Sequence, residues 1–395
     1  MKSSESPSVR KRLVWVIDGP LSGQLHKAAR LRPASHLCSL GWDVTLVTSS
    51  MPDEPCDPRI RFMQAKWPHV YGLGVLLYHG RIALRLLSGA LKADVVLFHE
   101  NSALYLLPLV PVLRFTRARH TRMLMDTRSL IMDHDHFRGK VRALALRLSH
   151  WVAARLPLAQ TCITPAMAEA VGVPSRKLVG VWPSGADPEE FEPARRNHRW
   201  PGPGDPIRLM YIGALHRERN LKAAMDAVVL ARAEGVNVSL EIVGDGFQRE
   251  ELEGYARSLG NGAIKVSPPV PRGRVPEVLS RGDIGILPFP DRLEFRVSSA
   301  IKLFEYMAAG MPIMASRIEA HTHVLDGADF VFWIDGEEPR SIFSTIREVD
   351  GARSALEEMG RQSLAYSVNW TWEASARRLS AALDRVMAHG DATNG

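Results

Sequence analysis

The feature that most constrains the fold is a repeated alternation of short apolar runs with longer amphipathic segments. The short runs are typical of buried parallel strands, and the segments between them have helical spacing. This alternation predicts an α/β chain in which helices cover a doubly wound, mostly parallel sheet. It occurs in two series. The strands expected in the first series are 13–18, 44–49, 60–65, 94–99, 123–126, 161–164 and 178–182, and those expected in the second are 207–212, 238–243, 264–266, 284–287, 313–315 and 330–334.

A stretch rich in Pro, Gly and charged residues separates the two series, as expected of a chain segment that passes between domains. We therefore predict two facing Rossmann-like domains in the 395 residues. Open sheets of this kind bind ligands at the carboxyl ends of their strands, so a cleft between the domains is the expected site. The predicted divisions are a first domain at 1–183, a linker at 184–206, a second domain at 207–366, and a crossover helix with a frayed tail at 367–395.

Several classes of protein are disfavoured. Three cysteines far apart give neither a disulfide framework nor a zinc pattern. The four consecutive residues Asp133 to His136 cannot converge on one ion, so we predict no metal site. The longest apolar run, 103–113, has 11 residues and two prolines, whereas a membrane span needs about 20. With a polar beginning and no signal pattern, the expected location is cytoplasmic.

Charge is unevenly distributed. Residues 1–183 contain 25 Lys and Arg against 12 Asp and Glu, whereas residues 184–395 contain 25 against 31. The basic half suggests either an anionic partner or only an arginine-rich solvated surface. Segments 72–92 and 103–122 are apolar with basic residues, and they either lie on an anionic membrane at the inner face or simply cover the sheet. No nucleic acid is expected, because no reader motif is present.

In the second series, the loops after the strands carry small and cationic residues. Gly213 and Gly244 each follow a predicted strand, where a glycine lets a ligand approach the backbone. Arg217 and Arg219 stand beside a predicted helix start, where unpaired N–H groups also attract phosphate. The alternative is that these arginines are ordinary solvated side chains.

The segment 283–316 is more specific. A predicted strand leaves through Pro288, and a helix begins near residue 299. Ser298 or Ser299 is expected to cap that helix, so that its first N–H groups bind a diphosphate. Lys302 and Glu305 share one helix face, and either serve a ligand or form an ion pair with each other.

These stretches resemble the retaining glycosyltransferases of family 4, the group 1 type, which have the GT-B fold. The resemblance is carried by YIGAL at 211–215, LEIVGDGFQREEL at 240–252, VPRGRVPEVLSRGDIGILPF at 270–289 and SAIKLFEYMAAGMPIMAS at 299–316. In the first half, IDGPLSGQLHKAARL at 17–31 and PSGADPEEF at 183–191 support it. The first half resembles the acceptor domain of that family.

The resemblance implies that Arg219 and Lys302 neutralise a donor diphosphate and that Glu305 holds its ribose. It also departs from the family pattern, because Val297 stands where the first glutamate of the E-x7-E motif belongs, and Ala214 replaces an arginine. The expected catalytic residues are His99, Asp126, Lys302 and Glu305, and the expected donor-binding residues are Gly19, Gly23, Gly213, Arg217, Arg219, Gly244, Pro288, Ser298, Ser299, Ile301, Lys302 and Glu305.

The function implied is transfer of a sugar from a nucleotide sugar, UDP- or GDP-linked, to a hydroxyl acceptor that is lipid-linked or anionic. The family pattern implies retention of anomeric configuration, no metal and no further cofactor. Polysaccharides, glycolipids and glycosylated metabolites are the product classes. Two alternatives stay open. One is a sugar-nucleotide 2-epimerase of the same fold, and the other is a noncatalytic partner subunit that binds nucleotide sugars.

Overall fold

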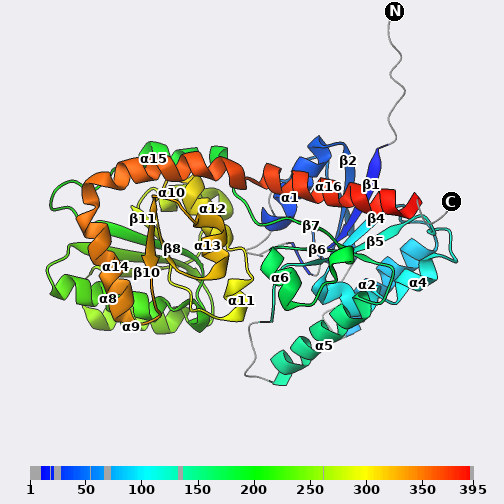
Figure 1. Ribbon diagram of the computed structural model, residues 1–395, viewed down its shortest axis with the longest axis horizontal. Coiled ribbons are helices and arrows are strands. Elements are labelled where there is room, and N and C mark those ends of the chain that lie inside the picture. The colour runs from blue at the N-terminus through cyan, green and yellow to red at the C-terminus, as the bar shows by residue number, and fades with distance from the viewer. Residues whose placement is uncertain are drawn as a thin grey trace, which may run out of the picture. The chain divides into compact units, whose positions relative to one another are not determined.

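The computed structural model describes residues 10–17, 19–21, 28–53, 55–65, 73–131, 137–260 and 262–391. Contacts divide the chain into two compact units. The first, called the first domain below, combines residues 1–183 with 372–395, and the second domain comprises residues 184–371. Figure 1 shows that each contains a sheet with helices on both faces.

The first domain is built on a parallel sheet with the strand order β3-β2-β1-β4-β5-β6-β7. This order reverses direction between β1 and β4, as in doubly wound dinucleotide-binding folds. Consecutive residues of β1 point to opposite faces and are nearly all buried, because helices cover both sides. Its strands are β1 (Lys11–Val16), β2 (Trp42–Thr48), β3 (Arg61–Gln64), β4 (Val95–His99), β5 (Arg122–Thr127), β6 (Ala159–Cys162) and β7 (Leu178–Val181).

Two apolar cores lie on the two faces of this sheet. One includes Leu13 and Trp15 of β1 and packs against α1 and α16. The other includes Val14 and Val16 and packs against α2, α3, α4 and the end of α5. The helices are α1 (Ala28–Ser39), α2 (Leu73–Leu87), α3 (Ala103–Leu106), α4 (Leu109–Leu113), α5 (Phe137–Ala153), α6 (Pro165–Ala170) and α16 (Trp372–Asp391), with 3-10 helices η1 (Glu100–Ser102) and η2 (Ser175–Lys177).

The second domain repeats the same strand order in a parallel sheet, β10-β9-β8-β11-β12-β13. Here the order reverses between β8 and β11, which places the expected ligand position at the carboxyl ends of these strands. One large apolar core fills the domain. The strands are β8 (Ile207–Ala214), β9 (Val238–Asp245), β10 (Ile264–Ser267), β11 (Ile284–Leu287), β12 (Ile313–Ser316) and β13 (Val331–Ile334).

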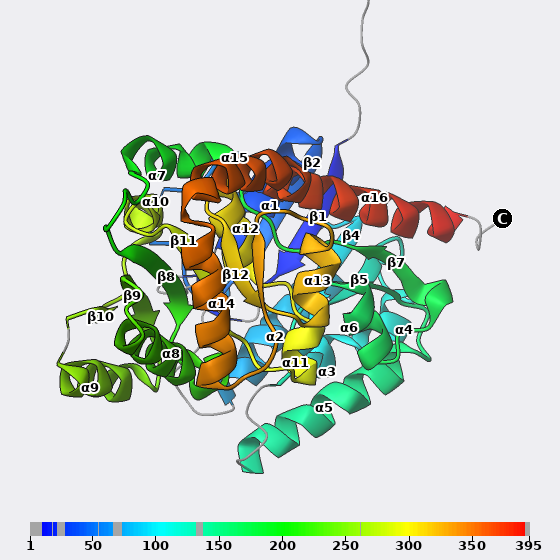
Figure 2. The same ribbon diagram turned by 60° about the vertical axis from the view of Figure 1, so that its left-hand side comes forward.

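Helices of the second domain pack on both faces of its sheet, and α14 contacts α8 along its length (Figure 2). They are α7 (Glu192–Asn197), α8 (Leu221–Ala233), α9 (Arg249–Leu259), α10 (Val275–Leu279), α11 (Leu293–Arg296), α12 (Ile301–Ala308), α13 (Glu319–Leu325), α14 (Pro339–Gly351) and α15 (Leu356–Ser367). The 3-10 helices are η3 (Pro188–Phe191), η4 (Arg217–Arg219), η5 (Arg272–Arg274), η6 (Arg353–Ala355) and η7 (Val368–Trp370).

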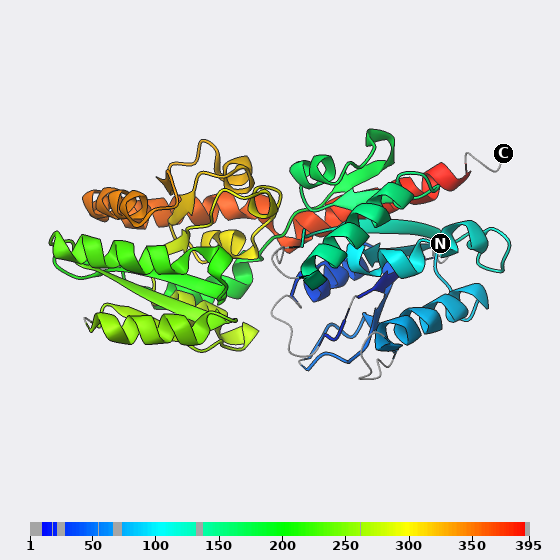
Figure 3. The same cartoon turned by 90° about the horizontal axis from the view of Figure 1, so that it is seen from below.

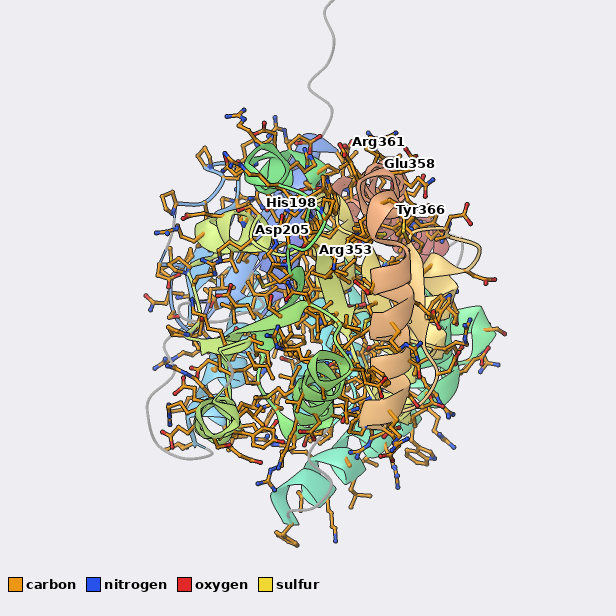
Figure 4. The ribbon with its side chains drawn as sticks, turned by 90° about the vertical axis from the view of Figure 1, so that its left-hand side faces the viewer. His198, Asp205, Arg353, Glu358, Arg361 and Tyr366 are labelled. Atoms are coloured by element: carbon orange, nitrogen blue, oxygen red, sulfur yellow. The ribbon has the colours of Figure 1, made fainter. Side chains whose placement is uncertain are left out.

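The stretch expected as a linker, 184–206, contains η3 and α7 and is tied to the second domain. His198 Nδ1 lies 3.1 Å from the carbonyl oxygen of Ser280. Arg353 donates from Nη1 to the carbonyl oxygen of Asp205 at 2.7 Å, so the entry to β8 is fixed against the end of α14 (Figure 4). These contacts give the segment a defined path beside the sheet.

The predicted fold class is confirmed, with two Rossmann-like parallel sheets and a C-terminal helix that belongs to the first domain. Every predicted strand is present within a few residues of its expected bounds. The helix α16 packs so closely on β7 that a Cβ at Gly180 would lie 2.8 Å from that of Ala382. Among the helices that the structure describes, none is long and apolar enough to cross a bilayer.

Candidate functional site

The carboxyl ends of β8 and β9 bring two glycines side by side. Gly213 and Gly244 are partners in the parallel register, with φ of 143° and 159°. A Cβ on Gly213 would collide with the end of the Lys302 side chain, and a Cβ on Gly244 would collide with the carbonyl oxygen of Gly213. Only glycine leaves room for this backbone approach. Gly213 thus lies at the carboxyl end of β8, beside the reversal of the sheet order, and Gly244 lies next to it on β9.

Lys302 projects from the first turn of α12 toward this edge. Its Nζ lies 5.6 Å from the centre of the Tyr211 ring. Burial and then the charge of Arg219 lower the pKa of Lys302 to about 7, against the opposite effect of Glu305. A lysine ammonium held in such surroundings is stabilised by an anion, because the anion offsets both causes of the shift.

Arg219 ends η4 and lies between two aromatic rings. Its guanidinium carbon is 4.7 Å from the ring centre of Phe289 and 5.0 Å from that of Phe295. The buried Nε atom has no hydrogen-bond partner among the described residues. By contrast, the side chain of Arg217 is 81% exposed and pairs with Glu251 at 3.2 Å. The two arginines of one loop therefore differ, and only Arg219 joins the cluster around Lys302.

Glu305 lies one turn further along α12 and forms a buried ion pair with Arg272 of η5. The same guanidinium also lies 3.3 Å from Glu190. Burial alone would lower the pKa of Arg272, but the two carboxylates raise it overall. The ion pair that sequence spacing suggested between Lys302 and Glu305 is therefore replaced by one with Arg272, which approaches from another element.

The predicted serine caps of α12 are not formed. Ala300 is the N-cap residue, and no side chain caps the helix. Ser299 instead accepts a hydrogen bond from the Ser184 backbone at 3.0 Å, while its own carbonyl accepts one from Ser184 Oγ at 2.9 Å. Ser298 donates to the Phe295 carbonyl at 2.9 Å. The two serine side chains form hydrogen bonds with neighbouring loops and not with α12. The first N–H groups of α12 therefore have no side-chain cap.

Three further expected residues occupy defined places in the second domain. Pro288 is buried directly after β11, and Ile301 begins α12 half-buried. Val297, which replaces the family glutamate, is only 2% exposed at the end of α11. An apolar side chain here packs into the core, so this position offers no polar atom to a ligand.

His99 and Asp126 of the first domain meet at adjacent strand ends, since they are partners in the register of β4 and β5. His99 Nδ1 is 3.4 Å from Asp126 Oδ2. Trp15 donates to His99 Nε2 at 2.9 Å, which leaves the neutral ring with its proton on Nδ1, facing the carboxylate. The side chains are 1% and 0% exposed.

Asp126 is surrounded by donors. Its Oδ1 accepts from Thr161 at 2.7 Å and from Trp182 Nε1 at 2.8 Å, and its Oδ2 lies 3.6 Å from Arg128. Burial alone would raise the pKa of Asp126, but the hydrogen bond from His99 and the charge of Arg128 hold it below its ordinary value. The pair therefore belongs to a buried polar cluster, and its catalytic role stays a prediction.

Gly19 follows β1, and its carbonyl oxygen accepts a hydrogen bond from Thr48 Oγ1 at 3.1 Å. Its partner in the predicted loop, Gly23, lies outside the described residues, as do Asp133 to His136. The first-domain loop therefore adds no described polar group to the candidate site.

Arg272 and Glu190 were not predicted as site residues. Both lie in stretches that resemble the family, VPRGR and PSGADPEEF. The only signal available from the sequence was their presence in those stretches. Both residues are far from Glu305 in the sequence, and the ion pairs of Arg272 with Glu190 and Glu305 depend on how η3, η5 and α12 pack together.

Comparisons with known proteins identify similar sequences and a similar fold. Residues 206–349 match the family model described as glycosyl transferases group 1. A curated relative is the GDP-mannose-dependent alpha-(1-6)-phosphatidylinositol dimannoside mannosyltransferase of Mycobacterium tuberculosis, 29% identical over 150 residues. The matched stretch is 36% of this chain and 36% of the relative, so only about a third of that relative's length is spanned.

Solved structures resemble the whole fold. The catalytic domain of starch synthase IV from Arabidopsis thaliana, bound to ADP and acarbose, has a TM-score of 0.73 at 10% identity over 96% of this chain and 99% of that one. The Anabaena protein HepE in complex with UDP-glucose has a TM-score of 0.69 at 13% identity over 95% and 99%. At these identities the likeness shows the fold. Residues 206–349 are thus similar to the group 1 glycosyl transferases, within a two-domain fold of the GT-B type.

Proposed function

We propose that this protein transfers a sugar from a nucleotide-sugar donor, and that the cluster around Lys302 binds the donor diphosphate. One observation carries the proposal. Lys302 and Arg219 lie near each other at the carboxyl edge of the second sheet, and neither forms an ion pair with a carboxylate of the described residues. Two adjacent cations without such a partner favour a polyanion.

The glycines supply the second part of the argument. A diphosphate placed over Gly213 and Gly244 would reach the backbone without meeting a side chain, and Lys302 already lies against Gly213. The uncapped N-terminus of α12 adds N–H groups and the positive end of its dipole. Charge that develops on the departing diphosphate would then be stabilised by groups fixed beforehand, which is the main source of rate acceleration in such sites.

Glu305 has a separate role in the proposal. Arg272 holds one of its oxygens, Oε1, and thereby keeps the carboxylate in place. We infer that this carboxylate accepts hydrogen bonds from the ribose hydroxyls of the donor. Glu305→Gln would keep the shape of the side chain while removing the charge, and is expected to weaken donor binding.

The donor and acceptor classes follow from the relatives. The mycobacterial relative is named for GDP-mannose and for a phosphatidylinositol dimannoside, and HepE was solved with UDP-glucose. We infer a UDP- or GDP-sugar as donor and a lipid-linked hydroxyl as acceptor. Retention of configuration and independence from metals belong to the same proposal. Coupling constants of the product's anomeric proton and activity in the presence of EDTA test them.

The test exploits two arginines of one loop. Binding of UDP, GDP and their sugars to the purified protein would be measured by calorimetry for the wild type, Arg219→Met and Arg217→Met. We expect one nucleotide to bind, with a loss of at least about tenfold for Arg219→Met, which removes a charge-assisted contact. Arg217→Met should bind like the wild type. Equal binding by both variants, or no nucleotide binding at all, would contradict the assignment.

Buried Val297 favours a second candidate, a noncatalytic subunit, because the family glutamate is absent. Mass spectrometry of the lipid products, together with proton NMR of the donor after incubation with and without a lipid extract, separates the possibilities. Transfer to a lipid supports the main proposal. Conversion of the donor without an acceptor would indicate an epimerase, and unchanged donor would indicate the noncatalytic subunit.

A further inference from the structure

Exposed apolar side chains are concentrated in one part of the first domain. Seventeen large apolar side chains are exposed among the described residues, and twelve of them lie between residues 73 and 151. Monomeric proteins scatter such residues singly, and a concentration marks an interaction surface. The twelve are Leu73, Leu76, Leu77, Leu84, Leu104, Val112, Phe115, Phe137, Val141, Leu144, Leu148 and Trp151.

The elements that carry them form one layer. Helices α2, α3, α4 and α5 share the same core on one face of the first sheet, opposite α1 and α16. Helix α3 contacts both α2 and α5. Figure 3 views the chain from the side of this layer. We call the outward side of residues 73–92, 103–121 and 137–155 the basic layer.

Helix α5 provides the clearest pattern within the basic layer. Its exposed apolar residues are spaced by four, three, four and three, which places them in a single stripe along the helix. The stripe faces solvent, with exposed fractions of 81% for Phe137, 66% for Leu144 and 55% for Trp151.

The inward side of α5 is made mostly of small or polar residues, and half-buried Val152 also packs against the core. Among the described side chains of the helix, those of Ser149, His150 and Ala153 are buried, as is Gly139. Burial lowers the pKa of His150 to about 4, so this histidine is neutral in the core. A surface helix normally buries its bulky apolar side chains. Here the arrangement is reversed, and the bulky stripe is available to a partner.

Charge identifies the partner. The basic layer contains eleven Arg and Lys and no Asp or Glu. Ten of the eleven are exposed, and the eleventh is Arg138, whose side chain is not described. At the end of α4, Arg117, Arg119 and His120 line a hollow together with the 90% exposed Phe115. Cations interleaved with Leu, Phe and Trp suit a surface that is anionic outside and apolar inside.

From this surface we propose that the first domain lies on an anionic bilayer through the basic layer, with the stripe of α5 inserted among the lipids. Trp151 fits the interfacial region, since the guanidinium of Arg155 stacks on its ring at 3.7 Å. A second copy of the chain suits the surface less, because a symmetric contact would oppose cations to cations. Nucleic acid would leave the apolar stripe unmatched. The inference does not depend on the donor site.

The test is cosedimentation of the full chain with vesicles. Phosphatidylcholine vesicles and vesicles that also contain phosphatidylglycerol would be compared at low and high salt. We expect partitioning at least about tenfold stronger on the anionic vesicles and a large loss at high salt, because screening weakens exposed charges. Leu144→Glu combined with Leu148→Glu should reduce partitioning at least about tenfold, since carboxylates enter the apolar stripe.

Two exposed phenylalanines provide the matched control. Phe115→Glu lies in the basic layer and should weaken vesicle binding, whereas Phe247→Glu, equally exposed in the second domain, should not. Circular dichroism establishes that each variant folds, and nucleotide binding by all variants separates this result from failure of the donor site. Equal binding to both vesicle types would overturn the proposal. So would a dimer that Leu144→Glu with Leu148→Glu dissociates while vesicle binding persists.

Discussion

The two domains share a strand order, but charged side chains near the carboxyl ends of their central strands are arranged in opposite ways. In the first domain, Asp126 is buried with a histidine, an arginine, a threonine and a tryptophan around it. In the second, Lys302 lies against the backbone of Gly213 and Arg219 lies against the ring of Phe289, without a carboxylate bound directly to either among the described residues. One cluster has its counter-charges supplied by the chain, and the other lacks them.

This difference teaches how to distinguish a structural charge from a binding charge. Buried ions that are matched by neighbouring donors and acceptors hold a fold in one arrangement, and removing one partner is costly. Ions at a strand edge that lack a counter-charge cost stability and are retained for a ligand. The first cluster should therefore respond to mutation through stability, and the second through function.

The largest effect is expected at Asp126. Asp126→Ala would leave Arg128 buried without its carboxylate and would remove the acceptor of Trp182 and Thr161. The loss of unfolding free energy should be about 3–5 kcal/mol. Chemical denaturation followed by circular dichroism measures it. A loss below about 1 kcal/mol, the size expected of an exposed ion pair, would show that the cluster is not structural.

Lys302→Met should have the reverse profile. It removes a cation that would face the leaving diphosphate, so kcat/KM for transfer should fall by about 10²–10³. The unfolding free energy should stay constant or rise, because a desolvated ammonium is replaced by an apolar side chain. Both quantities, kcat/KM and the unfolding free energy, are measured on the same preparation of Lys302→Met. A variant that melts earlier while retaining transfer would erase the contrast between the domains.

The effect of pH on nucleotide binding should be smaller than the effect of Lys302→Met on transfer, but still measurable. With a pKa of about 7 in the free protein, Lys302 must take up a proton above neutral pH to meet a diphosphate. Affinity for the nucleoside diphosphate should fall by up to about tenfold per pH unit above 7. Lys302→Arg, which stays charged, should flatten this dependence in calorimetry.

The titration of Lys302 also affects protein stability, which should rise with pH where nucleotide affinity falls. The folded pKa of Lys302 is below the ordinary value of 10.5, so between about pH 7 and 10.5 the unfolded chain binds more protons. This contribution to stability therefore rises with pH across that window. A wild type and a Lys302→Met variant with the same pH profile of stability would show that the lysine is not desolvated.

The smallest effect is expected at the exposed pair of Arg217 with Glu251. Glu251→Gln should change the unfolding free energy by less than about 1 kcal/mol, because both groups are solvated and screened. Denaturation at two salt concentrations checks this. A larger change would mean that solvent exposure does not separate structural from incidental charges in this chain.

The sequence predicted the fold because strand and helix periodicities are local properties of the chain. It also placed Gly213, Arg219, Lys302 and Glu305 near one another, since carboxyl ends of parallel strands meet at one edge. The sequence could not show which side chains pair across that edge. Arg272 therefore took the place of Lys302 beside Glu305.

Two further features depend on contacts that the sequence does not reveal. The position of His99 and Asp126 at strand ends identified the edge, but the partners that bury them, Trp15 and Trp182, come from other strands. The stripe of α5 was written in the sequence at helical spacing, yet such a pattern normally indicates a face turned to the core. Hydrophobic periodicity identifies the apolar face of a helix, but it does not show whether the core of the domain or a partner covers that face.

The helix α16 has a consequence for the order in which the chain becomes structured during synthesis. Leu379 and Leu383 of α16 complete the core that contains Trp15, Trp42 and Trp182. The ribosome synthesises those tryptophans before the second domain, and it synthesises α16, which packs on them, after the second domain. On the ribosome, the second domain is therefore able to fold as a unit while the first remains an open, aggregation-prone intermediate that waits for residues 372–387.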